Sequence, residues 1–365
     1  MPELNRKLFT GIAVFFLCGC ASTIRNGTVD YDNMMIFPAP PETARIQLLR
    51  TISSSSDIRE YRKLDQFVFG SSLLDLEIGI EKPYGVAIHD GVIYVCDTML
   101  PGLVVIDLKK GTFQAFQPFG RATLRKPVNL AIDAKGTIFV ADSERQQVVV
   151  YSPDLEYLYT IASKSVKPID VAILGDSLFI ADYQDREVEV WSIRRQEQIG
   201  VFPAAAATLA DSLKAAVPYS LTIDDRDNIY ITDFGQFRVV KYDREGNFSR
   251  AFGGLGRNLG QFARPKGIAV DREENLYVID AAFENAQLFD RDGQLLMFFG
   301  GAYQRPGNMY LPAQIVVDYH NNEFFRDYVI PGYELDYIII VTNQYGPDKI
   351  GIYGRIHLRG EPAVK

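Results

Sequence analysis

The chain has 365 residues, of which 47% are hydrophobic, and this composition excludes a disordered or collagen-like protein. Its 38 basic and 46 acidic residues give a net charge of −8, which argues against a nucleic-acid-binding surface, and three cysteines exclude a disulfide-rich scaffold. The many aromatic residues, with 29 glycines and 18 prolines to make turns, favour an all-β fold.

The N-terminus has the pattern of an export signal. Arg6 and Lys7 precede an apolar run from Leu8 to Leu17, which is too short to cross a bilayer as a helix. The run ends in Leu17-Cys18-Gly19-Cys20, which resembles the lipobox of bacterial lipoproteins. That resemblance implies a signal peptide over residues 1–19 and a lipid on Cys20. A signal cleaved nearby, with an accidental cysteine, is the alternative. Ala21 after the cysteine favours the outer membrane as the destination.

The segment after Cys20 is polar and then proline-rich, and it shows no helical or alternating period. We therefore expect residues 20–44 to be a lipidated tether, and residues 45–356 to form the folded body. Residues 357–365 are expected to be a C-terminal tail.

The body consists of six repeats. Each unit begins with a proline and an apolar strand, continues through a turn to a second apolar strand that ends in Asp or Asn, and then adds two more strands. The prolines are Pro83, Pro127, Pro168, Pro218, Pro265 and Pro312. Four strands in each of six units predict a six-bladed β-propeller. The alternating segment Ile46–Ile52 precedes the first unit, and we expect it to close the last blade as its outer strand.

The repeat pattern, clearest between Pro265 and Asp290, resembles the NHL repeat over residues 82–300, with a degenerate unit to about residue 355. With the lipobox and the tether, the chain resembles NHL-repeat lipoproteins of bacterial envelopes. The resemblance implies the propeller but no single activity, because relatives include binding modules, an amidating lyase and lactonase-like enzymes.

Few residues suit catalysis. The histidines His89, His320 and His357 occupy no equivalent blade positions, so a zinc site of the amidating-lyase kind is not expected, and we predict no cofactor. Asn129 and Asp170 occupy equivalent places on neighbouring inner strands. They are candidate polar residues of the central channel, either as two calcium ligands of the lactonase kind or as partners of backbone groups.

The residue that ends each second strand is polar, and we interpret this set as turn-forming side chains that accept hydrogen bonds from the next loop. They are Asp97, Asp142, Asp182, Asp233, Asp280 and Asn343.

Four blade-to-blade connections are basic and contain no acidic residue. Their cations are Arg121, Arg125, Lys126, Lys164, Lys167, Arg257, Arg264, Lys266 and Arg305. These connections share one face of a propeller, and we call the nine residues the basic rim. The rim either balances nearby carboxylates or forms an anion-binding mouth. On the opposite face, an aromatic insertion at residues 319–336 is expected to be a channel plug or a contact site.

The sequence thus favours a lipid-anchored envelope propeller, on the periplasmic or outer face, that serves as a binding or scaffold module for a protein or a small anionic ligand. The alternatives are a metal-dependent hydrolase or lyase of the lactonase or amidating type and, more weakly, a structural lipoprotein without a ligand.

Overall fold

The computed structural model describes residues 35–58, 77–161, 167–203 and 215–361. The expected signal peptide, Cys20 and Lys164 lie outside these residues. No helix in the described ranges is long and apolar enough to cross a membrane.

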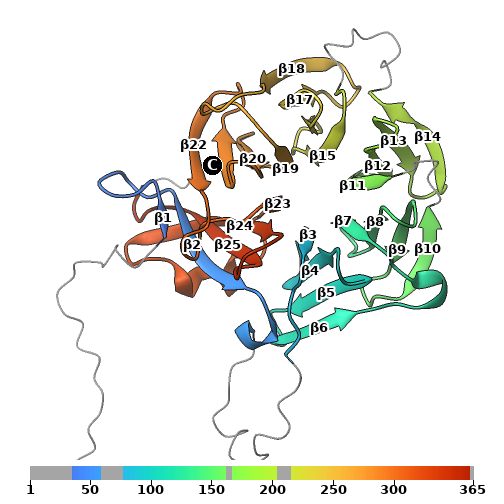
Figure 1. Cartoon of the computed structure of the whole chain (residues 1–365), viewed down its shortest axis with the longest axis horizontal. Coiled ribbons are helices and arrows are strands. Elements are labelled where there is room, and N and C mark those ends of the chain that lie inside the picture. Colours follow the sequence, from blue (N-terminus) through green and yellow to red (C-terminus); the bar gives the residue numbers. More distant parts are fainter. Residues whose placement is uncertain (1–34, 59–76, 162–166, 204–214, 362–365) are drawn as a thin grey trace, which may run out of the picture.

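Six antiparallel sheets form the blades of a propeller (Figure 1). Blade one is β3 (Pro83–His89), β4 (Val92–Asp97), β5 (Gly102–Asp107) and β6 (Thr112–Phe116). Blade two is β7 (Pro127–Ile132), β8 (Ile138–Asp142), β9 (Gln147–Tyr151) and β10 (Tyr157–Ile161). Blade three is β11 (Pro168–Leu174), β12 (Ser177–Asp182), β13 (Glu187–Ser192) and β14 (Glu197–Phe202).

The second half of the ring repeats this pattern. Blade four is β15 (Pro218–Ile223), β16 (Ile229–Asp233), β17 (Arg238–Tyr242) and β18 (Phe248–Gly253). Blade five is β19 (Pro265–Val270), β20 (Leu276–Asp280), β21 (Asn285–Phe289) and β22 (Leu295–Gly300). Blade six contains β23 (Pro312–Asp318), β24 (Tyr333–Asn343) and β25 (Ile350–Leu358). The first strand of each blade contacts those of both neighbours, so the inner strands form a closed ring.

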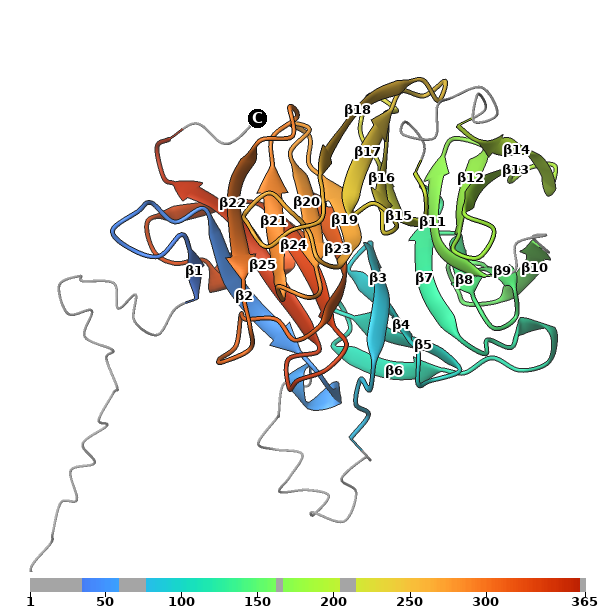
Figure 2. The same cartoon turned by 45° about the horizontal axis from the view of Figure 1, so that its top comes forward.

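Two N-terminal strands complete blade six, and the sequence predicts the inner one of the two. β2 (Ile46–Ile52) pairs with β25, with Ile46 opposite Arg355 and Ile52 opposite Ile350 (Figure 2). β1 (Ile36–Phe37) then adds a fifth strand on the outside of β2. The closing strand is confirmed, and it covers the edge that blade six would otherwise expose.

The expected domain boundaries need two corrections. Residues 35–44 belong to the body, because Ile36 and Ala44 are buried against Ile330 and Ile356. At the other end β25 continues to Leu358, two residues into the expected tail, and His357 is buried. In both places the burial of apolar side chains stabilises the folded body, and an extended tether or tail would leave these side chains in water.

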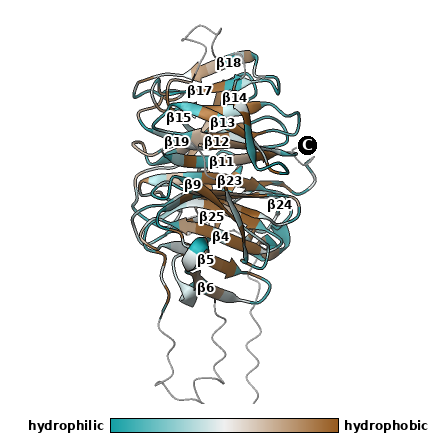
Figure 3. Cartoon of the chain, turned by 90° about the vertical axis from the view of Figure 1, so that its right-hand side faces the viewer, coloured by the Kyte–Doolittle hydropathy of each residue, from teal (hydrophilic) through white to brown (hydrophobic). Residues whose placement is uncertain are grey.

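The core lies between blades, where the apolar faces of neighbouring sheets meet. Strands are apolar on both faces because each sheet is covered on both sides. Tyr151, Tyr242, Phe289 and Tyr353 on third strands are fully buried in these interfaces. Seen edge-on, brown hydrophobic strands alternate with teal hydrophilic loops (Figure 3).

The propeller has two faces. The connection face carries the blade-to-blade connections and the loops between second and third strands. The hairpin face carries the turns between first and second strands and between third and fourth strands.

Candidate functional site

The inner strands place one equivalent residue from each blade around the axis, two residues after each blade's first proline. These residues are Gly85, Asn129, Asp170, Ser220, Gly267 and Gln314, and we call them the axial ring. A Cβ atom at Gly85 would lie 2.3 Å from Asn129 Oδ1, and one at Gly267 would lie 2.2 Å from Gln314 Oε1. The two glycines therefore provide the space that the neighbouring amide side chains occupy.

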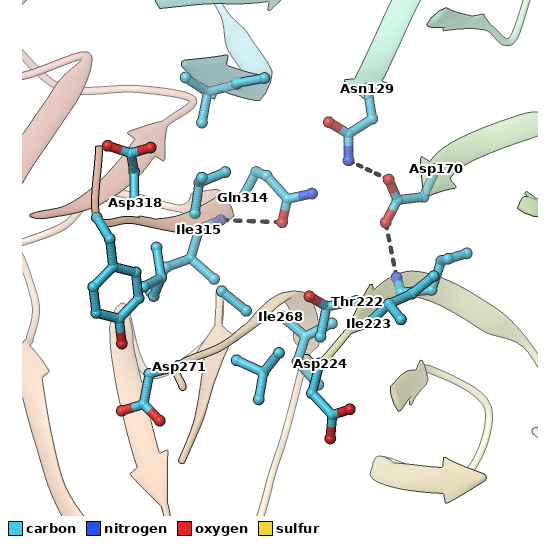
Figure 4. A pocket seen from close by; sticks show the side chains of 18 of the residues that line it. Asn129, Asp170, Thr222, Ile223, Asp224, Ile268, Asp271, Gln314, Ile315 and Asp318 are labelled. Carbon is cyan, nitrogen blue, oxygen red and sulfur yellow. Dashed lines mark hydrogen bonds between the residues drawn. The ribbon is translucent and has the colours of Figure 1, made fainter. Parts of the chain in front are cut away.

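Asn129 and Asp170, singled out in the sequence, contact each other. The Asn129 amide nitrogen donates a hydrogen bond to Asp170 Oδ1 (Figure 4). Asp170 also accepts the backbone N–H groups of Val171, at 2.8 Å, and of Leu221 in the next blade, at 2.9 Å. Of the two interpretations of Asn129 and Asp170, the geometry therefore matches the one in which these side chains bind backbone groups.

Asp170 is in an environment that favours its neutral form. Its side chain is buried, and burial raises its pKa to about 7, although hydrogen bonds from Ser220, Leu221 and Val171 oppose part of that rise. The carboxyl group thus changes charge near neutral pH.

Gln314 completes the polar part of the axial ring. Its Oε1 accepts the Ile315 N–H at 3.0 Å, but in the described part of the chain its Nε2 has no hydrogen-bond acceptor. Figure 4 shows this amide pointing toward Asn129 and Asp170 across the axis. The sequence analysis did not single out Gln314. The available signal in the sequence was Gly267, at the equivalent position of the preceding blade, because a residue without a side chain leaves room for the Gln314 side chain to turn inward.

A cavity of about 350 Å³ extends from the axial ring to the hairpin face. Asn129, Asp170 and Gln314 form its floor. Aliphatic side chains of the inner strands form its wall, among them Val86, Leu130, Val171, Leu221, Ile268 and Ile315.

The cavity mouth is acidic, but most of its carboxylates already have structural partners. Asp224 accepts the backbone N–H groups of Arg226 and Asn228, and the Tyr230 hydroxyl donates to it at 2.9 Å. Asp271 makes the equivalent turn in blade five and accepts the Tyr337 hydroxyl at 2.8 Å. Asp225 is the more available carboxylate, because its side chain is 77% exposed and lies 3.9 Å from Arg272.

Arg272 and Tyr319 form the aromatic side of the mouth. The Arg272 guanidinium lies 4.1 Å from the Tyr319 ring centroid, and its backbone N–H donates to the Tyr319 hydroxyl. Tyr319 and His320 are the insertion residues that line the cavity. The rest of the insertion does not cover the channel, because Phe324 and Phe325 pack into the core between blades six and one. Of the two expectations for the insertion, a plug or a contact site, the plug does not describe Phe324 and Phe325, which form an interblade contact.

The opposite end of the channel is narrow. Tyr84, Ile169, Tyr219 and Ala313 line only a small space between the axial ring and the connection face. Lys266 is buried beside them, with its Nζ 5.0 Å from the Tyr84 ring centroid. Burial, together with the charges of Arg264 and Lys82, lowers the pKa of Lys266 to about 7.

The other described rim residues are exposed on the connection face, and none of them lines the axial cavity. These are Arg121, Arg125, Lys126, Lys167, Arg257, Arg264 and Arg305. Within the described ranges, none of the rim residues forms an ion pair with a carboxylate. The rim is thus separated from the cavity by the narrow end of the channel, and its role in anion binding remains a prediction.

The carboxylates that end the second strands contact backbone rather than rim side chains. Asp142 accepts the N–H groups of Arg125 and Lys126 from the incoming connection and of Arg145 from its own loop. Asp280 does the same with Ala263, Arg264, Ala282 and Phe283. This confirms the turn-forming interpretation, and it shows that each Asp also joins neighbouring blades.

The histidines lie apart from one another, and His357 pairs with Asp336 at 2.8 Å. Across the described ranges, no three His, Cys, Asp or Glu side chains gather closely enough to hold a metal ion.

The NHL repeat family model matches residues 124–151, which run from the first rim connection through β9. No curated protein matches the chain. A streptogramin B lyase structure has a TM-score of 0.51 at 12% identity, covering 75% of this chain and 83% of the lyase.

Two further solved structures give similar values. A protein of unknown function from Bacteroides thetaiotaomicron has a TM-score of 0.55 at 16% identity, covering 77% of this chain and 70% of its own. A catalytically inactive virginiamycin B lyase from Staphylococcus aureus, with quinupristin, has a TM-score of 0.51 at 13% identity. The match covers 75% of this chain and 94% of the lyase. At these identities the likeness concerns the fold alone. The chain therefore folds as a six-bladed β-propeller in which residues 124–151 match the NHL repeat.

Proposed function

We propose that this protein is a lipid-anchored binding module of the bacterial envelope that holds a small ligand in the axial cavity. The observation that supports this proposal most directly is Gln314 Nε2, a hydrogen-bond donor directed into the cavity with no protein acceptor in the described residues. A donor that faces a cavity and has no protein partner is satisfied there by water or by a ligand.

The lining of the cavity defines the chemistry of the ligand. Gln314 and Asn129 offer amide groups at the floor, and the aliphatic wall suits an apolar body. The acidic mouth, with the exposed carboxylate of Asp225, disfavours an anion. The ligand is therefore a small neutral or cationic molecule with a hydrogen-bond acceptor at its inner end. An anionic partner would belong to the basic rim on the other face.

Mass spectrometry of small molecules released from the purified protein tests this proposal. A compound that copurifies with the native chain should be absent from Gln314→Leu, which keeps the side chain's size but removes its donor. Gln294→Leu is the matched control, because Gln294 is exposed on a turn of blade five. Full retention by Gln314→Leu would contradict the proposal, as would the release of no compound from the native protein.

The lipid anchor is a separate part of the proposal. Metabolic labelling with a fatty-acid analogue should mark the native protein and not Cys20→Ala, because the thiol of Cys20 is the expected acylation site. Labelling of the variant would refute the lipobox interpretation.

Elemental analysis separates a binding module from the hydrolase or lyase alternative. The lactonase-like and amidating enzymes that the sequence resembles depend on divalent metals, so stoichiometric calcium or zinc in the purified protein would favour catalysis.

A further inference from the structure

The exposed apolar side chains of the propeller are concentrated on the connection face. Eleven large hydrophobic residues are exposed in the described part of the chain, and six of them lie on this face. The six, which we call the apolar tips, are Met99, Phe119, Leu255, Leu259, Tyr310 and Tyr345. Phe119 is 90% exposed, which is unusual for a phenylalanine that serves only the fold.

The apolar tips alternate with the basic rim along the same loops. Phe119 lies two residues before Arg121, and Leu255 and Leu259 flank Arg257. Tyr310 shares its connection with Arg305. Two carboxylates of this sector already have partners, since Glu284 accepts the Leu311 N–H and Asp348 accepts the Tyr303 hydroxyl. The loops therefore present unpaired cations beside exposed apolar groups.

The direction of the N-terminal strands places Met35, which precedes β1, toward the same side. β2 ends at Ile52, opposite the first residue of β25 on the connection face, and β1 runs antiparallel to β2. β1 therefore runs away from the connection face, so its first residue lies nearer that face than its last. Met35 also contacts Gly307, in the connection that carries Arg305 and Tyr310.

We infer that the connection face docks on the surface of a bilayer that contains anionic lipids. Apolar tips enter the interface between headgroups and acyl chains, while the neighbouring cations contact the headgroup phosphates. The tips stand on separate loops around the ring, and a deformable lipid surface can accept all of them at once. The axial cavity then opens away from the membrane, because it lies on the hairpin face.

An environment-sensitive fluorophore tests this inference without the lipid anchor. A chain that begins at Ala21 keeps every described residue and has only Cys96, which is buried. In this chain Phe119→Cys carries the fluorophore on an apolar tip. Ile199→Cys carries it on β14, at a matched apolar position that is exposed but lies away from the connection face.

With vesicles that contain phosphatidylglycerol, emission from the Phe119→Cys label should shift to shorter wavelength and the Ile199→Cys label should not change. The shift should weaken as salt rises from about 0.1 M to about 1 M, since headgroup attraction is screened. No shift at Phe119→Cys, or an equal shift at both positions, would overturn the inference.

Charge variants provide the second measurement. Changing Arg121, Arg125, Lys126 and Arg257 together to Gln should weaken vesicle binding by about a hundredfold or more, because each basic residue at the surface contributes. The control changes four exposed cations of hairpin-face turns to Gln: Lys110, Arg195, Arg226 and Arg244. Equal losses would mean that net charge, rather than this face, determines binding. Binding of the rim variant at native affinity would also overturn the inference.

Discussion

At the scale of single residues, Asp170 links the axial ring to the pH dependence of stability. Its pKa in the folded protein is raised to about 7 by burial, above the value of 3.8 for an exposed carboxyl group. Between these values the folded state holds a proton that the unfolded state has released. Stability is therefore unaffected by this group below about pH 4 and falls as the pH rises toward 7.

Asp170→Asn should remove this dependence. The native protein should lose up to about 4 kcal/mol of unfolding free energy between about pH 4 and pH 7 through this group, and the variant should show a flatter slope. Urea unfolding at a series of pH values measures the effect. Asp225→Asn removes an exposed carboxylate from the same cavity and should leave the slope as it is in the native protein. An unchanged slope in Asp170→Asn would show that this carboxyl group is ionised throughout.

At the scale of structural elements, the Asp that ends each second strand holds two loops together. Asp280 is fully buried and accepts N–H groups from the incoming connection and from its own loop. Asp280→Ala should cost about 3 kcal/mol or more, because it leaves several amides without an acceptor. Asp290→Ala is the control, since Asp290 accepts two N–H groups in an exposed turn. Chemical denaturation compares the two, and equal losses would contradict the role in joining blades.

The closing strand makes a second prediction at this scale. Ile46 of β2 is completely buried in the core between blades five and six, whereas Leu158 on β10 is 47% exposed. Both are aliphatic residues on an outer strand. Ile46→Ala should cost about 2 to 5 kcal/mol and Leu158→Ala much less. A similar decrease in melting temperature for both variants would contradict a closing role for β2.

The sequence was sufficient for these elements because they repeat. The first proline, the apolar strands and the Asp or Asn that ends the second strand recur in each blade. Ile46–Ile52 reads as a strand that belongs to no unit, and the sixth unit lacks a fourth strand, so the two could be matched. β1 was missed because Ile36 and Phe37 lie beside a proline-rich run, and two apolar residues give no measurable period.

The candidate site was less accessible from the sequence. Asn129 and Asp170 were found because they occupy equivalent positions. Gln314 was missed because its inward direction depends on Gly267 in another blade. The insertion was expected to be a channel plug or a contact site because its aromatic residues suggested a surface patch, but Phe325 is completely buried in the core between blades. Both the direction of the Gln314 side chain and the burial of Phe325 depend on contacts between segments that are distant in the sequence.

At the scale of the whole molecule, the cavity and the basic rim lie on opposite faces, with the narrow end of the channel between them. This arrangement separates ligand access from membrane contact, because a molecule can enter from the hairpin face while the connection face is covered. The arrangement also makes the orientation of the protein measurable with single cysteines. Cys96 is buried, and burial raises its pKa well above the usual value, so it should not react with thiol reagents in the folded state.

In isolated envelope fragments, a membrane-impermeant maleimide should therefore distinguish the two faces. Asp225→Cys, at the cavity mouth, should be labelled equally before and after detergent is added. Leu255→Cys, on an apolar tip, should be labelled only after detergent removes the bilayer from the connection face. Both native positions are highly exposed in the free protein, so a difference between them measures what covers each face rather than burial within the fold. Equal labelling of the two variants before detergent would show that the connection face is open to solvent, and that the lipid anchor alone holds the protein to its membrane.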